Sequence, residues 1–344
     1  MHAMILAAGL GTRLRPLTDY RAKPAMPVRG RAVISLLLEL LARHGVDQVL
    51  INLHYLPLTI REAVERDHPS GMTLHWSEES RPLGTGGGIR RAAEFLRGSE
   101  ECLVMAGDML LDIDIPHLLS RHRESGRDVS LVLREDSRGA DFGTIGIDER
   151  GQLTRIGKQE LSPGSDVLGE REVRQGLFTG VRFLSRRALE GWPEDESFED
   201  LRDWLAPRIE KGLASVGAEI VEISESVWEP VGTPGEYLRV NLTPPSLPSL
   251  GGDVGVWNGS VLPLGPTRSS IIPRSAYVPA DAALERCVVW DDERVPAGFT
   301  GQDGVFAGNR FHPCSSHPST SKPAKGHSRA SRPMTSGNTS GGFP

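Results

Sequence analysis

Short hydrophobic segments alternate with amphipathic segments along residues 1–135. Compact apolar runs predict strands at 3–8, 48–53, 72–76, 102–106 and 129–133. Apolar residues spaced by three and four positions predict helices at 33–44, 58–66, 88–96 and 115–123. Alternating strands and helices form βαβ units, which build a parallel sheet covered by helices on both faces. The pattern therefore predicts a Rossmann-like, three-layer α/β fold with a mixed, mostly parallel sheet.

The pattern becomes less regular between residues 140 and 242. Apolar runs predict strands at 142–147, 153–156, 177–183 and 219–223, and a helix at 198–211 capped by Ser197. We expect this half to add strands and a lid over the edge of the sheet where the first strands end. Residues 1–242 are therefore assigned to one domain.

The rest of the chain has a different composition. Residues 243–253 are rich in Pro, Ser and Gly and predict a linker. Small and β-branched residues then recur roughly every six positions, which predicts a short left-handed parallel β-helix within segment 243–306. Such coils must pack against a neighbour to bury their faces. Residues 307–344 have few large apolar side chains, so we expect a disordered tail.

Composition narrows the class of protein. The 344 residues carry a net charge of -6 with a pI of about 6.0, which disfavours a nucleic-acid partner. The three cysteines form no CxxC pair, so a reducing compartment is expected. No apolar run approaches the roughly 18 residues that a membrane helix needs. We therefore expect a cytoplasmic protein that does not interact with membranes.

The segment after the first predicted strand contains the strongest chemical signal. Gly9 and Gly11 allow the backbone to approach phosphates closely, and Arg13 adds a bidentate cation. Lys23 follows in a stretch stiffened by prolines. The segment lacks the GxxxxGK[ST] pattern of a Walker A loop. Leu14 replaces the third glycine of GxGxxG, which disfavours a Rossmann oxidoreductase.

The string LAAGLGTRLRPLTDYRAKPAMPV at 6–28 resembles the signature of the sugar-1-phosphate nucleotidyltransferase superfamily, and the similarity extends over residues 1–242. The resemblance implies an enzyme that joins a sugar 1-phosphate to an NTP and releases pyrophosphate. It also implies that Arg13 binds the leaving pyrophosphate and that Lys23 steadies the α-phosphate. The remaining nucleotide contacts that it implies in this segment are Leu6, Ala8, Gly9, Gly11 and Thr12.

Two further motifs extend the resemblance. EESRPLGTGGG at 78–88 is similar to the base-recognition loop of mannose-1-phosphate and heptose-phosphate guanylyltransferases and muramate-phosphate uridylyltransferases. The implied base contacts are Glu79, Pro82, Gly84, Thr85 and Gly86. Asp108 follows a predicted strand, where the family binds Mg²⁺. Weaker matches imply that Gly143, Lys158 and Thr179 contact the sugar phosphate.

Two departures from the family pattern bear on activity. Gly157-Lys158-Gln159 stands where the family has Glu-Lys-Pro, so the glutamate is missing. Pro230 occupies the position of the second metal carboxylate in Trp228–Thr233. Three explanations are open: Glu229 turns in to bind the metal, Asp108 holds it with waters and phosphates, or activity has been lost.

The substrates expected from the resemblance are GTP and mannose 1-phosphate, with GDP-mannose for cell-envelope polysaccharide as the product. A uridylyl- or thymidylyltransferase is an alternative. A weakened paralogue that senses a nucleotide sugar is another, and Pro230 favours it. A homo-oligomer is also open.

Overall fold

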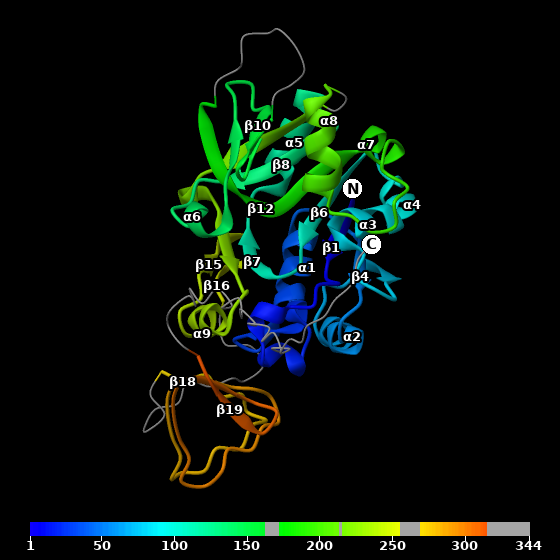
Figure 1. Cartoon of the computed structure of the whole chain (residues 1–344). Coiled ribbons are helices and arrows are strands. Elements are labelled where there is room, and N and C mark those ends of the chain that lie inside the picture. Colours follow the sequence, from blue (N-terminus) through cyan, green and yellow to red (C-terminus); the bar gives the residue numbers. More distant parts are fainter. Residues whose placement is uncertain (162–171, 213–214, 255–268, 315–344) are drawn as a thin grey trace, which may run out of the picture.

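The protein is described from a computed structural model that covers residues 1–161, 172–212, 215–254 and 269–314 (Figure 1). Within these residues, ten strands form the main sheet in the order β11-β10-β9-β12-β6-β1-β4-β5, with β8 and β13 joined at β12. These strands are β1 (His2–Leu6), β4 (Gln48–Leu53), β5 (Thr73–Glu78), β6 (Glu101–Ala106), β8 (Val129–Arg134), β9 (Ile145–Ile147), β10 (Leu153–Ile156), β11 (Gln159–Glu160), β12 (Arg174–Ser185) and β13 (Val216–Val221).

The sheet is parallel where sequence periodicity was most regular. Strand β1 pairs in parallel with β4 and β6, and β4 pairs in parallel with β5. The long β12 runs antiparallel to β6, β8 and β9, which makes the sheet mixed. Parallel alignment brings the carboxyl ends of β1, β4 and β6 to the same edge. The predicted mixed α/β fold is confirmed.

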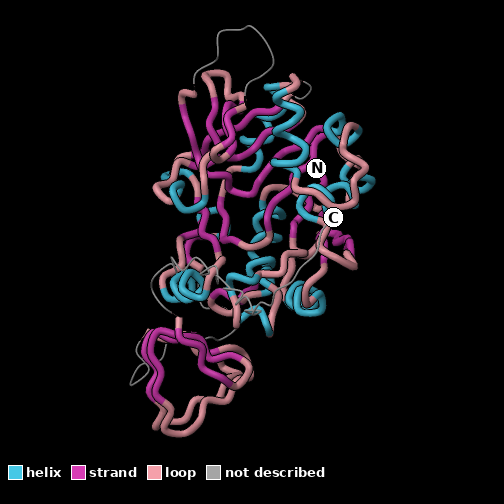
Figure 2. Tube along the Cα trace, viewed as in Figure 1, coloured by secondary structure: helices cyan, strands magenta, loops and turns pink. Residues whose placement is uncertain are grey.

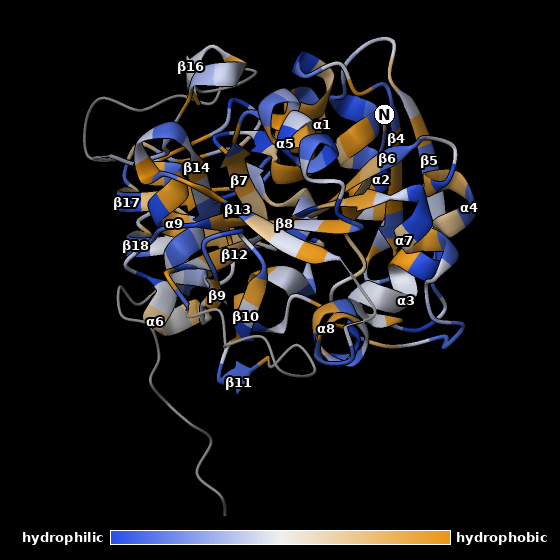
Figure 3. Ribbon diagram, turned by 90° about the horizontal axis from the view of Figure 1, so that it is seen from above, coloured by the Kyte–Doolittle hydropathy of each residue, from blue (hydrophilic) through white to orange (hydrophobic). Residues whose placement is uncertain are grey.

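Helices cover both faces of the sheet: in the view of Figure 3, α1 and α5 lie on one side of its strands, and α3 and α8 lie on the other. Alternate residues of β1 enter different cores: Ala3 and Ile5 lie in one cluster and Met4 in the other. Buried residues of α1 and α2 belong to the first cluster, and those of α3, α4 and α8 to the second. The helices are α1 (Val33–Arg43), α2 (Pro57–Arg66), α3 (Gly84–Arg91), α4 (Ala93–Leu96), α5 (Ile115–Ser125), α6 (Gly139–Phe142), α7 (Arg186–Glu190), α8 (Ala206–Glu210) and α9 (Pro234–Leu242).

Several short elements differ from the sequence prediction. Helix α3 begins at Gly84, so the predicted base loop is helical where a loop was expected up to residue 88. The helix predicted at 198–211 is a π-helical turn, η4 (Asp200–Leu205), followed by α8. Phe142 ends helix α6 and does not begin a strand. The small sheet of β7 (Met109–Asp112) and β14 (Val227–Pro230) was missed because each strand is only four residues long.

Residues 243–254 contain more regular structure than a linker. They form β15 (Ser246–Leu247), the turn η6 (Pro248–Leu250) and β16 (Gly252–Asp253). The other short elements lie near the N-terminus and after α8: η1 (Thr12–Leu14), η2 (Leu17–Asp19), η3 (Lys23–Ala25), β2 (Pro27–Val28), β3 (Arg31–Ala32) and η5 (Ile223–Glu225).

Residues 269–314 form a separate set of stacked turns, which we call the C-terminal module (Figure 2). Its strands are β17 (Ala283–Val289), β18 (Thr300–Ala307) and β19 (Arg310–Pro313). β17 and β18 are parallel, and Ile271 continues the ladder through Val288 to Val305. Parallel turns agree with a coiled chain, whereas the predicted left-handed β-helix stays a prediction.

The boundary predicted at residue 307 is wrong for the first residues beyond it. Ala307 ends β18, and β19 folds back antiparallel on it. Ala307 and Cys314 are buried in the main core cluster. Apolar residues at Phe311 and Cys314 were too few to be recognised against the surrounding polar sequence. Residues 315–344, the rest of the predicted tail, lie outside the described part of the chain.

Candidate active site

The glycine-rich segment turns sharply at the end of β1. Gly11 has a φ of 62°, a left-handed conformation that glycine adopts without steric penalty. A Cβ there would lie 2.8 Å from Thr18 Cγ2, so a side chain has no room. The Thr18 hydroxyl donates to the Gly11 carbonyl oxygen at 3.1 Å. The turn, which we call the phosphate loop (residues 9–23), is thus packed against itself.

Lys23 and Asp108 meet at the shared edge of β1 and β6. Lys23 Nζ donates to Asp108 Oδ2 at 2.6 Å. The Lys23 side chain is 11% exposed and that of Asp108 is 41% exposed, so the carboxylate faces solvent while the ammonium is enclosed. The Gly107 amide donates to the Leu6 carbonyl oxygen, which fastens the residue before Asp108 to the end of β1. A phosphate entering here would meet a cation that is held in place.

The segment after β14 closes the other side of this pair. The Val231 amide donates to the Asp108 carbonyl oxygen at 3.0 Å. A Cβ at Gly232 would lie 3.8 Å from Lys23 Nζ and 3.9 Å from an Arg13 guanidinium nitrogen. Arg13 has no ion-pair partner among the described residues, and its side chain is exposed. Two cations from the phosphate loop therefore converge beside Gly232, one paired and one available for an anion.

A buried carboxylate connects the end of β1, just before the phosphate loop, to the predicted base loop. Asn52, at the end of β4, accepts from the Ala7 amide at 2.7 Å and donates to Glu79 Oε1 at 2.7 Å. Glu79 Oε2 accepts from the Leu83 amide at 3.2 Å. Glu79 is only 6% exposed, and through Asn52 and the Leu83 amide it links the chain at Ala7 to the base loop.

The glycines of the base loop pack against residues 196–199. A Cβ at Gly86 would lie 2.2 Å from the Phe198 ring, and one at Gly84 would lie 2.5 Å from the Phe198 carbonyl oxygen. The Gly86 amide donates to that same oxygen at 2.9 Å, and the Thr85 hydroxyl donates to Glu199 and Asp200. The Gly86 amide therefore already has a partner, and the predicted contact of Gly86 with the nucleotide stays a prediction. Pro82 is exposed, and its contact with the base stays a prediction.

The three residues predicted on the sugar side have different surroundings. Lys158 is exposed, without an ion-pair partner among the described residues, and Gly143 is exposed after α6. Thr179 is 2% exposed, and its hydroxyl donates to the Val132 carbonyl oxygen at 2.8 Å. The Thr179 hydroxyl thus already has a partner, and its contact with the sugar phosphate stays a prediction. The Thr179 carbonyl oxygen accepts from the Trp228 indole at 2.9 Å, so the residue supports β14.

Comparison with known proteins identifies the family. The family model described as "Nucleotidyl transferase" matches residues 2–243. The chain belongs to this nucleotidyl transferase family. Known relatives include a mannose-1-phosphate guanylyltransferase of Mycobacterium tuberculosis, 28% identical over 86% of this chain and 81% of the relative. A D-glycero-alpha-D-manno-heptose 1-phosphate guanylyltransferase of Aneurinibacillus thermoaerophilus is 32% identical over 70% of this chain and 96% of the relative.

Other relatives act on a different base. A UTP–glucose-1-phosphate uridylyltransferase of Synechocystis is 26% identical over 69% of this chain and 61% of the relative. The solved structure of Yersinia pseudotuberculosis HddC, complexed with GMP-PN, has a TM-score of 0.57 and 24% identity, covering 70% of this chain and 97% of that one. This likeness supports the fold. Together, the matches establish a sugar-1-phosphate nucleotidyltransferase, whose base and sugar they leave open.

The nucleotidyl transferase family typically uses a divalent metal, and this chain offers one carboxylate for it. Pro230 faces Met109 in the β7–β14 ladder, next to Asp108, and has no side-chain ligand to offer. Among the described residues, no group of three His, Cys, Asp or Glu side chains is arranged to hold a metal. Mg²⁺ is often bound by one or two carboxylates together with substrate phosphates. The half-exposed Asp108 fits this role alone.

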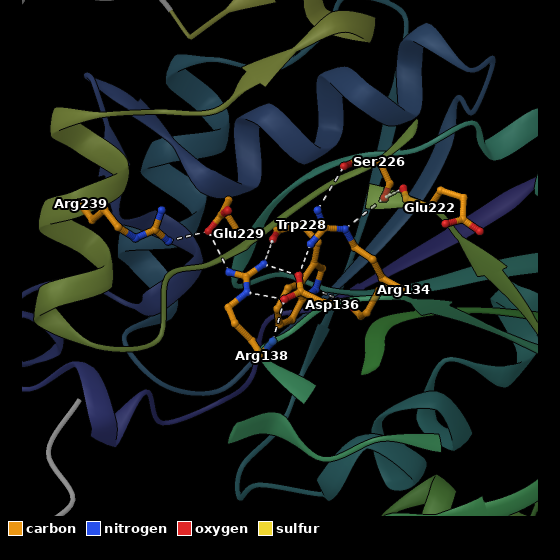
Figure 4. A network of polar contacts seen from close by, with 9 residues as sticks. Arg134, Asp136, Arg138, Glu222, Ser226, Trp228, Glu229 and Arg239 are labelled. Atoms are coloured by element: carbon orange, nitrogen blue, oxygen red, sulfur yellow. Dashed lines mark hydrogen bonds and ion pairs between the residues drawn. The ribbon is translucent and has the colours of Figure 1, made fainter. Parts of the chain in front are cut away.

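Glu229 is paired with two arginines in this structure. Its Oε2 accepts from Arg138 at 3.1 Å and from Arg239 at 2.5 Å (Figure 4). Arg138 also donates to Asp136 and lowers the pKa of that carboxyl below its usual range. Neighbouring residues of a strand point to opposite faces. Glu229 would have to leave both arginines to bind the metal, so this alternative stays a prediction that requires a local rearrangement.

Sequence reasoning missed two residues that shape the site, Asn52 and Glu236, and gave no role to Gly232 of the Trp228–Thr233 motif. Asn52 is a polar residue near the end of a mostly apolar predicted strand, which is a usable sequence signal for a positioning role. The structure shows that it is only 3% exposed. Glu236, in the first turn of α9, accepts from the Gly232 amide at 2.8 Å. This contact joins residues four positions apart through a turn that periodicity does not detect.

No described helix is long and apolar enough to cross a membrane.

Proposed function

We propose that this enzyme joins a sugar 1-phosphate and an NTP to give an NDP-sugar and pyrophosphate. The observation that carries the proposal is the ion pair of the enclosed Lys23 with the solvent-facing Asp108, beside Arg13, which has no ion-pair partner among the described residues. A sugar-phosphate oxygen would attack the α-phosphorus, and the bond from that phosphorus to the bridging oxygen of the β-phosphate would break. Pyrophosphate would leave with the electron pair of that bond.

The chain's residues would act mainly by positioning and charge. The attacking phosphate oxygen is ionised at neutral pH, so the reaction needs no general base. Lys23 would neutralise charge that develops on the α-phosphate, and Arg13 would bind the departing pyrophosphate. Backbone groups from Gly9 to Thr12 would surround the phosphates. Lys158 and Gly143 would receive the sugar phosphate.

Mg²⁺ is the metal proposed for this site, held by Asp108 together with the nucleotide's phosphates. Bound there, it would supply a Lewis acid for the phosphate oxygens. Asp108 would have to divide its two oxygens between the metal and Lys23, because Oδ2 already accepts from the ammonium.

Mannose 1-phosphate with GTP is the proposed substrate pair. Support comes from the names of the relatives, since those of M. tuberculosis and A. thermoaerophilus are guanylyltransferases. The product would be GDP-mannose, a donor for cell-envelope polysaccharide. A cytoplasmic location, where NTPs are made, and a homo-oligomeric state remain predictions. A uridylyl- or thymidylyltransferase is the alternative that the Synechocystis relative favours.

A second candidate function is a sensor that binds a nucleotide sugar without turning it over. Pro230 and the paired Glu229 favour it, because both remove a second carboxylate from the site.

A nucleotide panel separates the two functions. Pyrophosphate release would be measured with GTP, UTP, dTTP, ATP and CTP, each with mannose, glucose and heptose 1-phosphates and MgCl2. The proposal predicts turnover with one nucleotide preferred. Binding of an NDP-sugar without turnover in any combination would instead support the sensor.

Two substitutions test the assignment of the pair. Lys23→Met and Asp108→Asn should each lower kcat by about 100-fold or more, as loss of preorganised charge does in other enzymes. Asp114→Asn is the matched control, because this carboxylate lies on the same segment but caps α5 through the His117 amide. The control should keep its rate. Near-normal turnover in either of the first two variants would remove that residue from the mechanism.

A further inference from the structure

We propose that the C-terminal module positions the phosphate loop, through Trp290 stacked on Arg21. The inference rests on the proposed function, because it assigns the loop to the nucleotide. Arg21 is two residues before Lys23, and Tyr20 precedes it. The module would therefore act on the cation that receives the α-phosphate without contacting the substrate itself.

The outer face of the loop is held by the module. The Arg21 guanidinium lies 4.7 Å from the centre of the Trp290 ring, and its NH1 is 3.8 Å from Asp291 Oδ2. The Tyr20 ring meets Trp290 edge-on at 6.3 Å and His312 at 5.7 Å. A Cβ at Gly308 would lie 2.1 Å from the Tyr20 ring, so the module's backbone approaches this ring closely.

The inner face of the same segment supports the site. The Arg21 and Tyr20 amides both donate to the Leu17 carbonyl oxygen. Thr18, one residue further, packs on Gly11 and bonds its carbonyl oxygen. Residues 17–22 thus form a short bridge with the module on one side and the glycine turn on the other.

Trp290 is itself rigidly placed. It is 3% exposed, and its backbone amide donates to the Phe306 carbonyl oxygen in the module. Its indole donates to the Tyr237 hydroxyl at 2.9 Å, which in turn donates to the Pro27 carbonyl oxygen at 2.8 Å. Tyr237 belongs to α9, whose first turn carries Glu236 and so holds Gly232. The indole is therefore a fixed surface against which Arg21 can be ordered.

Without this stacking, the phosphate loop would be less ordered in the free enzyme. Nucleotide binding would then have to order the loop. A desolvated cation–π contact contributes enough to change an equilibrium constant about tenfold. We therefore expect weaker nucleotide binding with little change in the rate of the bound complex. A catalytic residue would change kcat, so the split between KM and kcat distinguishes the two roles.

The test uses the full chain with Arg21→Met, which keeps the aliphatic stem and removes the charge. Arg66→Met is the matched control, because Arg66 also approaches Asp291, at 3.7 Å, but lies at the end of α2. Trp290→Leu and the conservative Trp290→Phe form a second pair, in which the phenyl ring retains a face for Arg21. Hydrogen exchange of amides 14–22 would be followed without nucleotide, and GTP binding and turnover would be measured with MgCl2.

The proposal predicts about tenfold faster exchange at amides 14–22 in Arg21→Met and Trp290→Leu. The KM for GTP should rise about tenfold in both variants, with kcat within about twofold of the parent. Trp290→Phe should keep most of the parent's slow loop exchange and low KM for GTP, and Arg66→Met should resemble the parent in both. Unchanged loop exchange in Arg21→Met, or an equal change in Arg66→Met, would overturn the inference. Failure of the parent chain to turn over any nucleotide would refute the proposed function, while the exchange data still decide on the positioning.

Discussion

The buried ion pair of Arg182 and Asp200 should control both stability and the base loop. Arg182 lies in β12 and Asp200 begins η4, and each side chain is 3% exposed. Burial lowers the pKa of Arg182 to about 10, so the guanidinium is still charged at pH 7. Asp200 also accepts from the Thr85 hydroxyl at 2.6 Å in the first turn of α3. The perturbation is Asp200→Asn, which keeps the shape and removes the charge.

The expected loss of stability follows from this burial. Breaking a buried pair on one side costs about 3–5 kcal/mol, because a charge is left without compensation. Domains of this kind have about 5–15 kcal/mol of stability in total. The substitution should therefore remove a large share of it.

Urea unfolding followed by tryptophan fluorescence would measure this loss, since Trp192 and Trp204 lie in the same cluster as Leu205. Arg182→Met with Asp200→Leu should recover much of the loss seen in either single variant, because an apolar pair leaves no buried charge. Asp19→Asn is the control: its pair with Arg15 is exposed, and such pairs contribute less than about 1 kcal/mol. A loss below about 1 kcal/mol in Asp200→Asn would refute the reasoning.

Three further predictions concern pH, packing and the sugar side. Burial lowers the pKa of His122 from 6.5 to about 4, so the folded state favours the neutral ring. Its stabilising effect is complete above pH 6.5 and is lost as pH falls towards 4. Urea unfolding at pH 5 should show about 2 kcal/mol less stability than at pH 7.5, and a His122→Gln variant should lack this difference. Gly86→Ala should destabilise by about 1–3 kcal/mol through the Phe198 ring, measurable by thermal unfolding; an unchanged midpoint would mean that the ring moves freely. Lys158→Met should raise the KM for the sugar phosphate about tenfold or more and leave that for the nucleotide unchanged, and an equal rise in both would contradict the assigned side.

The sequence alone determined the fold class and pointed to the residues of the candidate site. The strand at Gln48–Leu53 was predicted to the residue, and the first helix within one residue at its C-terminal end. Periodicity succeeds here because each element buries one face against one sheet. Gly11, Lys23 and Asp108 were singled out because their motifs resemble those of the family, and the structure brings Lys23 and Asp108 into contact, while their roles stay predictions.

Only the tertiary structure decided which groups have partners. It showed Glu229 held by two arginines, the Thr179 hydroxyl bonded to Val132, and the Gly86 amide bonded to Phe198. Val132 lies 47 residues from Thr179 and Arg138 lies 91 residues from Glu229, whereas Arg239 is 10 residues from Glu229 but belongs to another element, α9. Local patterns carry no information on such separations, because hydrogen bonds form wherever the fold brings donor and acceptor together. The contact of Trp290 with Arg21 has the same origin, since it joins the last described part of the chain to the first loop.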